Sequence, residues 1–393
     1  MKKHPTIAIY SGVSISTTFI ERLIEGLVEA GTHIYIFGSD SGKSMKHNNL
    51  HYVIHGKKWH KLFILIKYTI LLFLFKPREK KMLDAIIDEK YTNKLLWQLK
   101  FYPVLYHQPD IFHIQWAKGL DDWIWVQDFS MKLVLSLRGA HINYSPIADS
   151  KLAAMYKKNF PKVDAFHAVS KAIAEEATKY GAPLERIKIV KSGLSARDYP
   201  FVLKTAVLEG TLNILSVGRN HWIKNYSLAL DVMSVLKSKN IDFHYSIIGM
   251  DDNEGLLFQR EQLQLKENVS FIKTLPFNEV QIAIKSADVL LLPSLKEGIA
   301  NVVLESMMLG TLVISSDCGG MAEAIKPSQT GYLVPTRDIE AMACAIEEVI
   351  ELPLEAYQKM IMNARTSIEK QHSTEGMITD MLDLYHEITV DNL

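Results

Sequence analysis

Short strand-like apolar runs alternate with amphipathic stretches from one end of the chain to the other. In the first half these runs are Ile7–Tyr10, His33–Phe37, Tyr52–Ile54, Ile111–Gln115, Lys132–Leu137, Ala165–Val169 and Ile187–Val190. Helical patterns lie between several of them, such as Thr18–Glu29, which is followed by Gly31, a residue typical of a helix end. A chain that alternates in this way builds parallel sheets with helices on both faces. The sequence therefore predicts an α/β fold with doubly wound sheets.

The same plan starts again in the second half. The strand candidates there are Asn213–Val217, His244–Ile248, Ser270–Ile272, Val289–Leu292 and Leu312–Ser315. Between the halves, residues 195–210 have mixed polarity, contain Pro200 and show no clear period, so we expect a linker at 197–210. The sequence thus predicts two Rossmann-like domains, 1–196 and 211–371, facing each other across a cleft. Ligands of such domains bind outside the carboxyl ends of the strands.

Charge and cysteine content exclude several classes of protein. Lysine plus arginine and aspartate plus glutamate both total 44 in 393 residues, whereas a dedicated nucleic-acid binder needs a basic excess. The two cysteines, Cys318 and Cys344, fit a reducing compartment and supply no Cys-based metal cage. The apolar run Thr6–Tyr10 is too short for a signal peptide. We therefore expect a cytoplasmic protein with no nucleic-acid partner.

Several ligand-binding motifs are malformed or absent. Residues 38–44 resemble a P-loop, but three residues separate Gly38 from Gly42 where the phosphate-wrapping loop needs four. The chain has no Gly-x-Gly-x-x-Gly, which weighs against a nicotinamide dehydrogenase, and no Gly-x-Ser-x-Gly. It also lacks Asp-x-Asp and His-Glu-x-x-His. We therefore expect neither a metal nor another cofactor.

The segment 291–310 carries the pattern most indicative of chemistry. A strand is expected to end near Pro293, a loop then carries Glu297 and Gly298, and a helix follows over about 300–309. The helix N-terminus offers unpaired N–H groups and a partial positive charge, which form a natural cradle for a diphosphate. Glu305 lies in the second helical turn, so one carboxylate on each side could hold sugar hydroxyls. Taken alone, either glutamate is better explained as a solvated surface residue.

A second segment, 216–225, places two cations in a strand-to-helix loop. Arg219 offers a fork that matches phosphate oxygens, and Lys224 offers a point charge. On its own, such a loop can equally carry incidental charges. Together with the two glutamates, it supplies what a sugar-diphosphate leaving group requires.

These segments together resemble the retaining glycosyltransferases of family 4, which have the two-domain GT-B architecture. The resemblance covers nearly the whole chain and runs through Ala168–Lys171, Val190–Leu194, Gly218–Asn225, Glu297–Glu305, Ser316–Glu323 and Gly331–Val334. The combination is specific, whereas no single piece is. In this family the last helix crosses back onto the first domain, which implies the same role for residues 372–393.

The resemblance also implies roles for individual residues. Arg219 and Lys224 would hold the diphosphate of a UDP- or GDP-sugar, Glu305 would bind its ribose, and Glu297 its sugar. The donor site would be completed by Gly298 and by the backbone amides of Asn301, Val302 and Val303. The family transfers sugars with retention of anomeric configuration and usually needs no metal.

The first domain departs from the family at one position. Many members have His-Gly after the strand that faces the donor, whereas this chain has Arg138 followed by Gly139, and His141 lies three residues beyond Arg138. Arg138 and His141 are therefore candidate catalytic residues, although Arg138 is equally well explained as a structural ion-pair partner. His113 is more often a packed strand residue than a ligand.

The first loop, Ser11–Thr18, is small and polar, as suits a loop that approaches donor or acceptor. Gly12 is therefore a candidate donor-binding residue. The same loop also offers Ser16 and Thr17 as helix caps, and both roles can hold together.

A basic and apolar segment, 57–81, stands out in the first half. Its apolar part, Leu62–Phe75, is shorter than the roughly 20 residues that a membrane span needs. Its cations are Lys57, Lys58, Lys61, Lys67, Lys76, Arg78, Lys80 and Lys81, opposed by Glu79. Basic flanks around an apolar face suit shallow binding to an anionic membrane surface. The alternative is a core helix with solvated ends.

We therefore expect a cytoplasmic, metal-independent retaining glycosyltransferase, peripheral at the inner membrane face. It would move a sugar from a nucleotide donor to a glycan or lipid-linked acceptor in cell-surface polysaccharide biosynthesis. One alternative is a nucleotide-sugar epimerase or phosphorylase-like enzyme on the same architecture. The other is a catalytically silent nucleotide-binding scaffold, against which the intact donor-site residues argue.

Overall fold

The computed structural model describes residues 5–14, 17–42, 44–204, 210–250 and 252–390. The chain forms two compact units, an N-terminal unit of Met1–Val169, Ala174–Gly193 and Thr374–Leu393 and a C-terminal unit of Ser170–Ile173 and Leu194–Ser373. Part of the expected linker, 205–209, lies outside the described residues, as do the cap candidate Ser16 and the end of the expected tail, 391–393.

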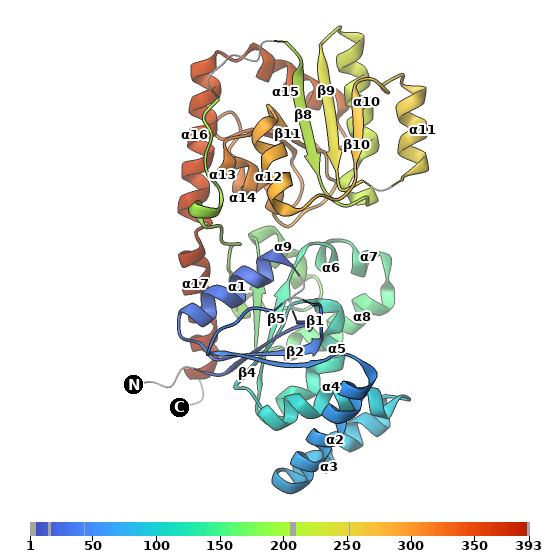
Figure 1. Ribbon diagram of the computed structural model, residues 1–393, viewed down its shortest axis with the longest axis vertical. Helices are drawn as coiled ribbons and strands as arrows, with labels where there is room; N and C mark the ends of the chain where they lie inside the picture. Colours follow the sequence, from blue (N-terminus) through green and yellow to red (C-terminus); the bar gives the residue numbers. More distant parts are fainter. Residues whose placement is uncertain (1–4, 15–16, 43, 205–209, 251, 391–393) are drawn as a thin grey trace. The chain divides into compact units, whose positions relative to one another are not determined.

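The N-terminal unit is built on a parallel sheet with the strand order β3-β2-β1-β4-β5-β6-β7 (Figure 1). Its strands are β1 (Ile7–Val13), β2 (Ile34–Ser39), β3 (Leu50–His55), β4 (Ile111–Ile114), β5 (Lys132–Leu137), β6 (Ala165–Ala168) and β7 (Ile187–Ile189). Its helices are α1 (Thr18–Glu29), α2 (Lys58–Phe75), α3 (Pro77–Lys90), α4 (Lys94–His107), α5 (Leu120–Trp123), α6 (Gly139–Asn143), α7 (Ser145–Ala148), α8 (Ser150–Asn159), most of α9 (Lys171–Thr178) and α17 (Thr374–Val390). Strands β4 and β6 are buried along their whole length, as parallel strands covered on both faces are.

The C-terminal helix α17 packs within the N-terminal unit. Gly26 of α1 faces Ile378 of α17 so closely that a Cβ at position 26 would lie 2.5 Å from the Ile378 side chain. Further along α17, the Tyr385 hydroxyl lies 2.7 Å from Nδ1 of His113, in the middle of the sheet. The last helix is therefore joined to the N-terminal core by both apolar packing and a buried hydrogen bond.

The C-terminal unit repeats the architecture on a parallel sheet with the order β10-β9-β8-β11-β12-β13 (Figure 1). Its strands are β8 (Leu212–Val217), β9 (Phe243–Ile248), β10 (Val269–Ile272), β11 (Val289–Leu292), β12 (Leu312–Ser316) and β13 (Tyr332–Val334). Its helices are α10 (Tyr226–Ser238), α11 (Glu254–Gln262), α12 (Phe277–Ser286), α13 (Asn301–Leu309), α14 (Met321–Ala324), α15 (Ile339–Glu351) and α16 (Leu354–Gln371). One apolar core contains α10 and α15, and a second contains α12 and α13. Both units are thus α/β with parallel sheets, as the sequence predicts.

The structure corrects the expectations for the first loop and for one strand. Residues 11–13, expected in a loop, belong to β1, because a register shift before Gly12 lets the strand go on pairing with β2. Gly12 adopts a left-handed conformation there, with a φ of 87°. Thr17 stands at the N-cap of α1, but its side chain makes no capping hydrogen bond. The short strand β13 was not among the strands predicted from apolar runs, but it lies in the segment Gly331–Val334 that resembles the family.

Helices α2, α3 and α4 lie between β3 and β4 in the chain and project from one end of the N-terminal unit (Figure 1). Their mutual contacts are extensive, and α4 also packs on β2. Within the described residues, no helix combines the length and the apolar character that crossing a membrane requires.

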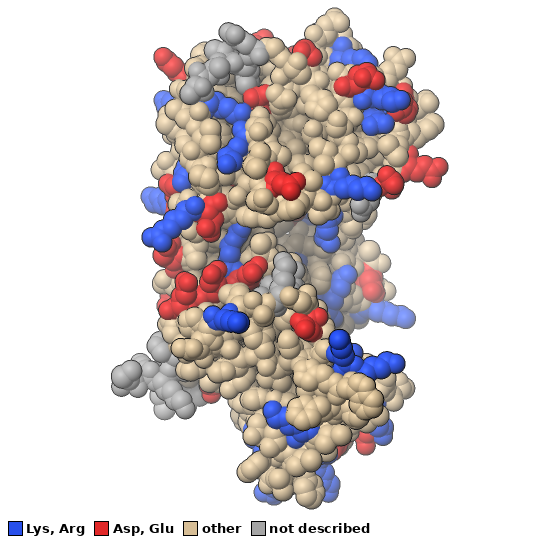
Figure 2. All heavy atoms as spheres, viewed as in Figure 1, with Lys and Arg blue, Asp and Glu red and all other residues tan. Residues whose placement is uncertain are grey.

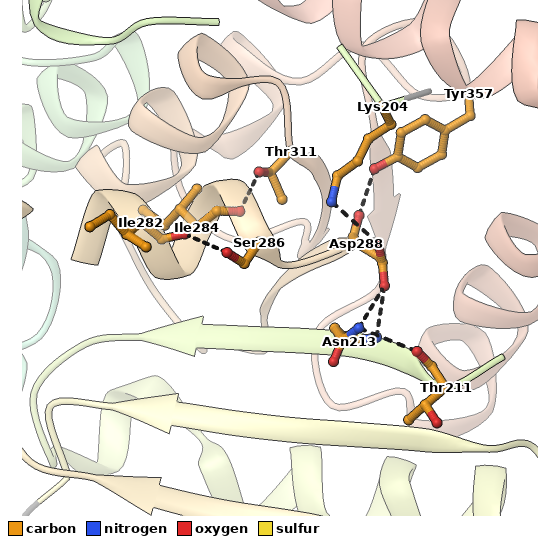
Figure 3. A network of polar contacts seen from close by, with 9 residues as sticks. All are labelled: Lys204, Thr211, Asn213, Ile282, Ile284, Ser286, Asp288, Thr311 and Tyr357. Carbon is orange, nitrogen blue, oxygen red and sulfur yellow. Dashed lines mark hydrogen bonds and ion pairs between the residues drawn. The ribbon is translucent and has the colours of Figure 1, made fainter. Parts of the chain in front are cut away.

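At the amino edge of the C-terminal sheet, Asp288 joins several elements (Figure 3). Its Oδ2 accepts hydrogen bonds from the backbone N and Nδ2 of Asn213 at 2.9 and 3.3 Å. Its Oδ1 lies 3.3 Å from Nζ of Lys204, and its backbone carbonyl accepts a hydrogen bond of 2.7 Å from the Tyr357 hydroxyl. The starts of β8 and β11 are therefore connected to α16 and to the segment before residue 205.

Replacing Asp288 by alanine is expected to destabilise the C-terminal unit. The change leaves Lys204, whose side chain is only 18% exposed, without its acceptor and removes the acceptor of the Asn213 N–H. The loss of a buried acceptor typically costs about 1–3 kcal/mol in the free energy of unfolding. Thermal melts followed by circular dichroism should therefore shift downward by several degrees. Asp252→Ala, at an exposed position with no side-chain partner among the described residues, is the control. Equal melting temperatures for the two variants would contradict this role.

Candidate functional site

Glu297 and Lys224 meet at the carboxyl edge of the C-terminal sheet. Glu297 lies in the loop between β11 and α13, and Lys224 lies in the loop after β8, the strand next to β11. Nζ of Lys224 is 2.7 Å from Oε1 of Glu297, and the Ser294 hydroxyl donates to the same oxygen at 3.0 Å. Both side chains are mostly buried, with 18% and 16% exposed. The carboxylate is therefore neutralised and held in one orientation.

The loop that carries Glu297 is fixed by its backbone as well. The N–H of Leu295 donates to the Ile223 carbonyl at 2.8 Å, which ties this loop to the Lys224 loop. Gly319, with a φ of +63°, lies so close to the Glu297 carbonyl oxygen that any Cβ there would collide with it. The Gly-Gly pair at 319–320 is thus explained by packing against the site loop.

Helix α13 spans Asn301–Leu309, close to the predicted 300–309, and its C-cap is Gly310, which has a φ of 90°. Its N-cap is Ala300, and no side chain among the described residues caps it. The N–H of Val303 donates to the Ala300 carbonyl at 3.0 Å, and the Val303 side chain is fully buried. The first turn of the helix thus engages the N–H of Val303. The amides of Asn301 and Val302 at this N-terminus carry the partial positive charge of the helix.

Glu305 lies in the second turn of α13, as predicted, and is partly buried. The hydroxyl of Tyr199 donates to its Oε1 at 3.2 Å. Tyr199 is completely buried and lies within the predicted linker, 197–210, so it holds Glu305 from that segment. Sequence reasoning missed Tyr199, because nothing in the surrounding sequence links it to α13.

Arg219 differs from Lys224 although both lie in the same loop. Its side chain is exposed, and within the described part of the chain it makes no ion pair or side-chain hydrogen bond. The loop thus presents one cation engaged with Glu297 and one that is open to a ligand. Gly298 is buried directly after Glu297, and Gly320 packs on its carbonyl.

In the N-terminal unit, Arg138 directly follows β5. Its Nη2 donates to Oε1 of Gln115 at 3.1 Å, and its guanidinium lies 4.3 Å above the ring of Phe19. Its Nε is buried without a hydrogen-bond partner among the described residues. Burial lowers its pKa to about 9. The structure thus shows an amide and an aromatic ring around Arg138 in place of a structural ion pair.

His141 lies in α6, and its ring is 5.4 Å from that of Trp116. Its Nδ1 is buried without a partner. Burial, aided by the charge of Lys118, lowers the pKa of His141 to about 4. The imidazole is therefore neutral near pH 7 and can donate or accept a hydrogen bond there.

His113 is a fully buried strand residue, as the sequence analysis favours. Its Nε2 is 2.8 Å from the Ser136 hydroxyl, and Ser136 also contacts Nδ1 of His167 at 2.9 Å. Burial, and next the charge of Arg138, lowers the pKa of His113 to about 3 and that of His167 well below its usual value. Two neutral histidines therefore lie beneath Arg138.

Gly12 lies at the carboxyl edge of the N-terminal sheet, where its carbonyl accepts a hydrogen bond from the Ser39 hydroxyl at 3.2 Å. It borders a cavity of about 270 Å³ that Tyr10, His55 and Ile64 also line. Burial raises the pKa of Tyr10 to about 12 and lowers that of His55.

The structure brings only some of the predicted residues together. Lys224, Glu297, Gly298 and the N-terminus of α13 lie together in the C-terminal unit, whereas Arg138 and His141 belong to the N-terminal unit. Three supporting residues were missed, namely Ser294, Tyr199 and Gln115. Only Gln115, at the end of a predicted strand, carried a sequence signal. Among the described residues, no group of three or more His, Cys, Asp or Glu side chains is arranged to hold a metal ion.

Comparison with known proteins finds a family match in the C-terminal half and relatives that cover about 60% of the chain. Residues 204–367 match the family described as glycosyl transferases group 1. The chain is 27% identical over 266 residues to the amylovoran biosynthesis glycosyltransferase AmsK of Erwinia amylovora, a match that covers 64% of each protein. It is 28% identical over 237 residues to the putative colanic acid biosynthesis glycosyltransferase WcaL of Escherichia coli K12, covering 58% of each. The matches span less than two thirds of the length of these relatives.

Solved structures match the fold over almost the whole chain. Sucrose-phosphate synthase from Thermosynechococcus elongatus aligns with a TM-score of 0.75 and 18% identity, covering 99% of this chain and 100% of that one. HepE from Anabaena, solved in complex with UDP, aligns with a TM-score of 0.73 and 14% identity, covering 97% and 100%. The two Rossmann-like units therefore have the fold of GT-B glycosyltransferases.

Acidification is expected to destabilise the N-terminal unit through His113. Its pKa falls from 6.5 to about 3 on folding, so below about pH 6.5 the unfolded chain binds a proton that the folded unit excludes. The contribution of His113 to stability is therefore complete above about pH 6.5 and is lost as the pH falls, by at most about 1.4 kcal/mol per pH unit.

Urea unfolding of the wild type and of His113→Gln at about pH 7.5 and about pH 5 tests this. The variant should be less stable at neutral pH because its hydrogen bonds are altered, but it should lose less stability on acidification. His60→Gln, at an exposed position, should keep the wild-type difference. If His113→Gln lost as much unfolding free energy on acidification as the wild type, another group would be responsible for the loss.

Proposed function

We propose that this chain is a retaining glycosyltransferase that moves a sugar from a nucleoside-diphosphate sugar to a hydroxyl of a glycan or lipid-linked acceptor. The observation that carries the proposal is the Lys224–Glu297 contact next to the uncapped N-terminus of α13. Support comes from the group 1 match over residues 204–367, which includes all of these groups. Further support comes from HepE, which has the same fold and was solved with UDP and with UDP-glucose.

The proposed donor site places positive groups where negative charge grows. When the bond between the anomeric carbon and the diphosphate oxygen breaks, the departing diphosphate gains charge. The amides of Asn301 and Val302 and the positive end of α13 would stabilise it, as preorganised donors do in other enzymes. Lys224 donates one of its three N–H groups to Glu297, so two N–H groups remain for phosphate oxygens. Arg219 would add a bidentate contact.

The two glutamates would position the rest of the donor. Glu297, held by Lys224 and Ser294, would accept hydrogen bonds from the donor sugar. Glu305, held by Tyr199, would accept them from the ribose. Because both carboxylates are fixed by other side chains before a ligand arrives, they bind with little loss of rotamer freedom.

In the proposed reaction the acceptor oxygen bonds to the anomeric carbon on the face that the diphosphate leaves. The proton of the acceptor hydroxyl passes to the departing diphosphate oxygen, so atoms and charge balance and the configuration is retained. Arg138 and His141 would act from the N-terminal unit. Arg138 stays charged at neutral pH, because its pKa is about 9, and neutral His141 can hydrogen-bond a sugar hydroxyl.

We further propose that the chain acts in cell-surface polysaccharide biosynthesis on the cytoplasmic side of the membrane. AmsK and WcaL are described as glycosyltransferases of amylovoran and colanic acid biosynthesis. We propose no metal requirement, because the cations and amides of the donor site supply the positive charge that a metal would otherwise provide. Turnover that persists after chelation with EDTA would support this part of the proposal.

A thermal-shift screen of UDP-, GDP-, ADP- and CMP-sugars is expected to identify one donor class. A ligand at a hundred times its dissociation constant adds about 2.7 kcal/mol of stability, which is readily visible. Arg219→Ala should lose the shift while melting like the wild type without ligand, because Arg219 has no side-chain partner among the described residues. Lys266→Ala, an exposed cation just before β10 at the opposite edge of the sheet, should keep the shift. A shift that survives in Arg219→Ala would contradict the donor-site assignment.

Changing Glu297 to glutamine is expected to separate binding from transfer. The near-isosteric amide can still accept the Ser294 hydrogen bond, so the fold and donor binding should persist, while transfer should fall by at least about 10²-fold. The assay follows labelled sugar from the donor found by the screen into lipid and glycan extracts. Glu267→Gln, at an exposed position, is the control.

Undiminished transfer by Glu297→Gln would rule out the assigned role. Interconversion of the donor without an acceptor, followed by NMR, would favour the epimerase alternative. Donor binding without any turnover of the wild type would favour a silent scaffold.

A further inference from the structure

The outward face of α2 is apolar throughout, although it borders solvent. Its exposed stripe consists of Trp59, Leu62, Phe63, Ile66, Ile70, Phe73 and Leu74, whose side chains are 48–83% exposed. Their spacing of three and four residues places them on one side of the helix. We name these residues the outer stripe of α2. An ordinary surface helix carries polar residues on this side, so the stripe calls for a partner.

Helix α2 packs against the rest of the N-terminal unit through the side opposite the outer stripe. Ile64, Tyr68 and Leu72 are buried, and the Tyr68 hydroxyl lies 2.8 Å from Nε2 of His107 in α4. The helix is thus anchored by its inner face alone. Burial of the outer stripe is not needed for the fold, which means that the stripe can serve an interaction.

Cations without acidic partners surround the outer stripe. Within the described residues, these are Lys57, Lys58, Lys61 and Lys67 on or next to α2 and Arg78 and Lys81 on α3, all of them exposed. Other cations nearby are engaged: Lys80 pairs with Asp84, and Lys76 donates to the Leu105 carbonyl. In Figure 2 the end of the N-terminal unit that carries α2 and α3 shows tan and blue spheres with few red ones.

We propose that the outer stripe of α2 and its basic surroundings dock this protein onto the surface of an anionic lipid bilayer. The stripe would lie in the plane of the interface, with its apolar side chains at the boundary between headgroups and acyl chains. Trp59, at the start of the helix and 83% exposed, has the amphipathic ring that favours this depth. The unpaired lysines would meet the anionic headgroups.

Charge complementarity selects the bilayer over a second copy of the chain. A two-fold symmetric contact would place the same surface patch of both copies face to face. Lys57, Lys58 and Lys61 would then oppose their own counterparts while the stripe excludes water, and like charges repel under those conditions. An anionic lipid surface accommodates both the apolar stripe and the cations.

Flotation of the full chain with lipid vesicles tests the proposal. Binding is expected to vesicles that contain phosphatidylglycerol, to be weak with phosphatidylcholine alone, and to fall as salt is raised. Lys57→Gln with Lys61→Gln should weaken binding about fivefold per residue, the equivalent of about 1 kcal/mol each. Lys266→Gln with Lys359→Gln, both exposed in the C-terminal unit, should bind like the wild type.

The double variant Phe63→Ala with Phe73→Ala tests how much the apolar side chains of the outer stripe contribute to vesicle binding. Their side chains are 62% and 69% exposed, so the fold should be unaffected while binding weakens by at least about tenfold. Phe258→Ala, at a side chain that is 65% exposed on α11, is the matched control. Trp59 fluorescence, isolated by subtracting the Trp59→Phe variant, should shift to the blue on vesicles.

Three results would overturn the proposal. The wild type could fail to bind anionic vesicles, the Phe63 and Phe73 variant could bind as well as the Phe258 control, or Phe63→Ala with Phe73→Ala could abolish a dimer seen by sedimentation. The donor-dependent thermal shift is measured without lipid, so failure here is distinguishable from failure of the proposed function.

Discussion

All strands in each sheet run parallel, so their carboxyl ends share one edge, and loops that follow neighbouring strands must meet there. The Lys224–Glu297 contact is a direct consequence. The two residues are 73 positions apart, yet they follow β8 and β11, which are adjacent in the sheet. The bond from the Leu295 N–H to the Ile223 carbonyl joins the loops themselves. The sheet order therefore brings the two loops of the candidate site together through the backbone as well as through the side chains.

Polar groups at the two edges of the C-terminal sheet differ in how completely other side chains bind them. At the amino edge, Asp288 binds Asn213 and Lys204 in a network whose members hold one another. At the carboxyl edge, α13 has no side-chain cap, and Arg219 has no side-chain partner among the described residues. A sheet that places its stabilising network at one edge can leave donors at the other for a ligand. Departures from local stabilising rules are expected at functional sites.

The central strands β4, β6, β11 and β12 were predictable because they are buried along their whole length, as parallel strands covered on both faces are. The α13 boundaries were predictable because Gly310 ends the helix with a left-handed residue. The side chains that contact the site residues could not be predicted from the sequence. Tyr199 reaches Glu305 across 106 positions, and only the folded C-terminal unit brings them together. The three-residue strand β13 is too short for a periodic signal.

Arg138 is a second residue whose partners could not be predicted from the sequence. Its sequence context left an ion pair and a ligand contact equally open, because the identity of its neighbours depends on how β4 and β5 align. The structure places Gln115 and Phe19 beside it and two neutral histidines beneath it. The partners of this partly buried guanidinium are thus an amide and an aromatic ring, neither of which the sequence around Arg138 indicates.

Helix α2 connects the two proposals through its two faces. On its inner face, Ile64 lines the cavity of about 270 Å³ that Tyr10 and Gly12 border at the carboxyl edge of the sheet. Its outer stripe is the surface proposed to lie on lipid. A single helix, about 10 Å in diameter, then separates the cavity from the bilayer. An acceptor anchored in that bilayer would then be held next to this cavity of the N-terminal unit. Docking would thereby select lipid-linked acceptors over free glycans by location, without any contact that recognises the lipid itself.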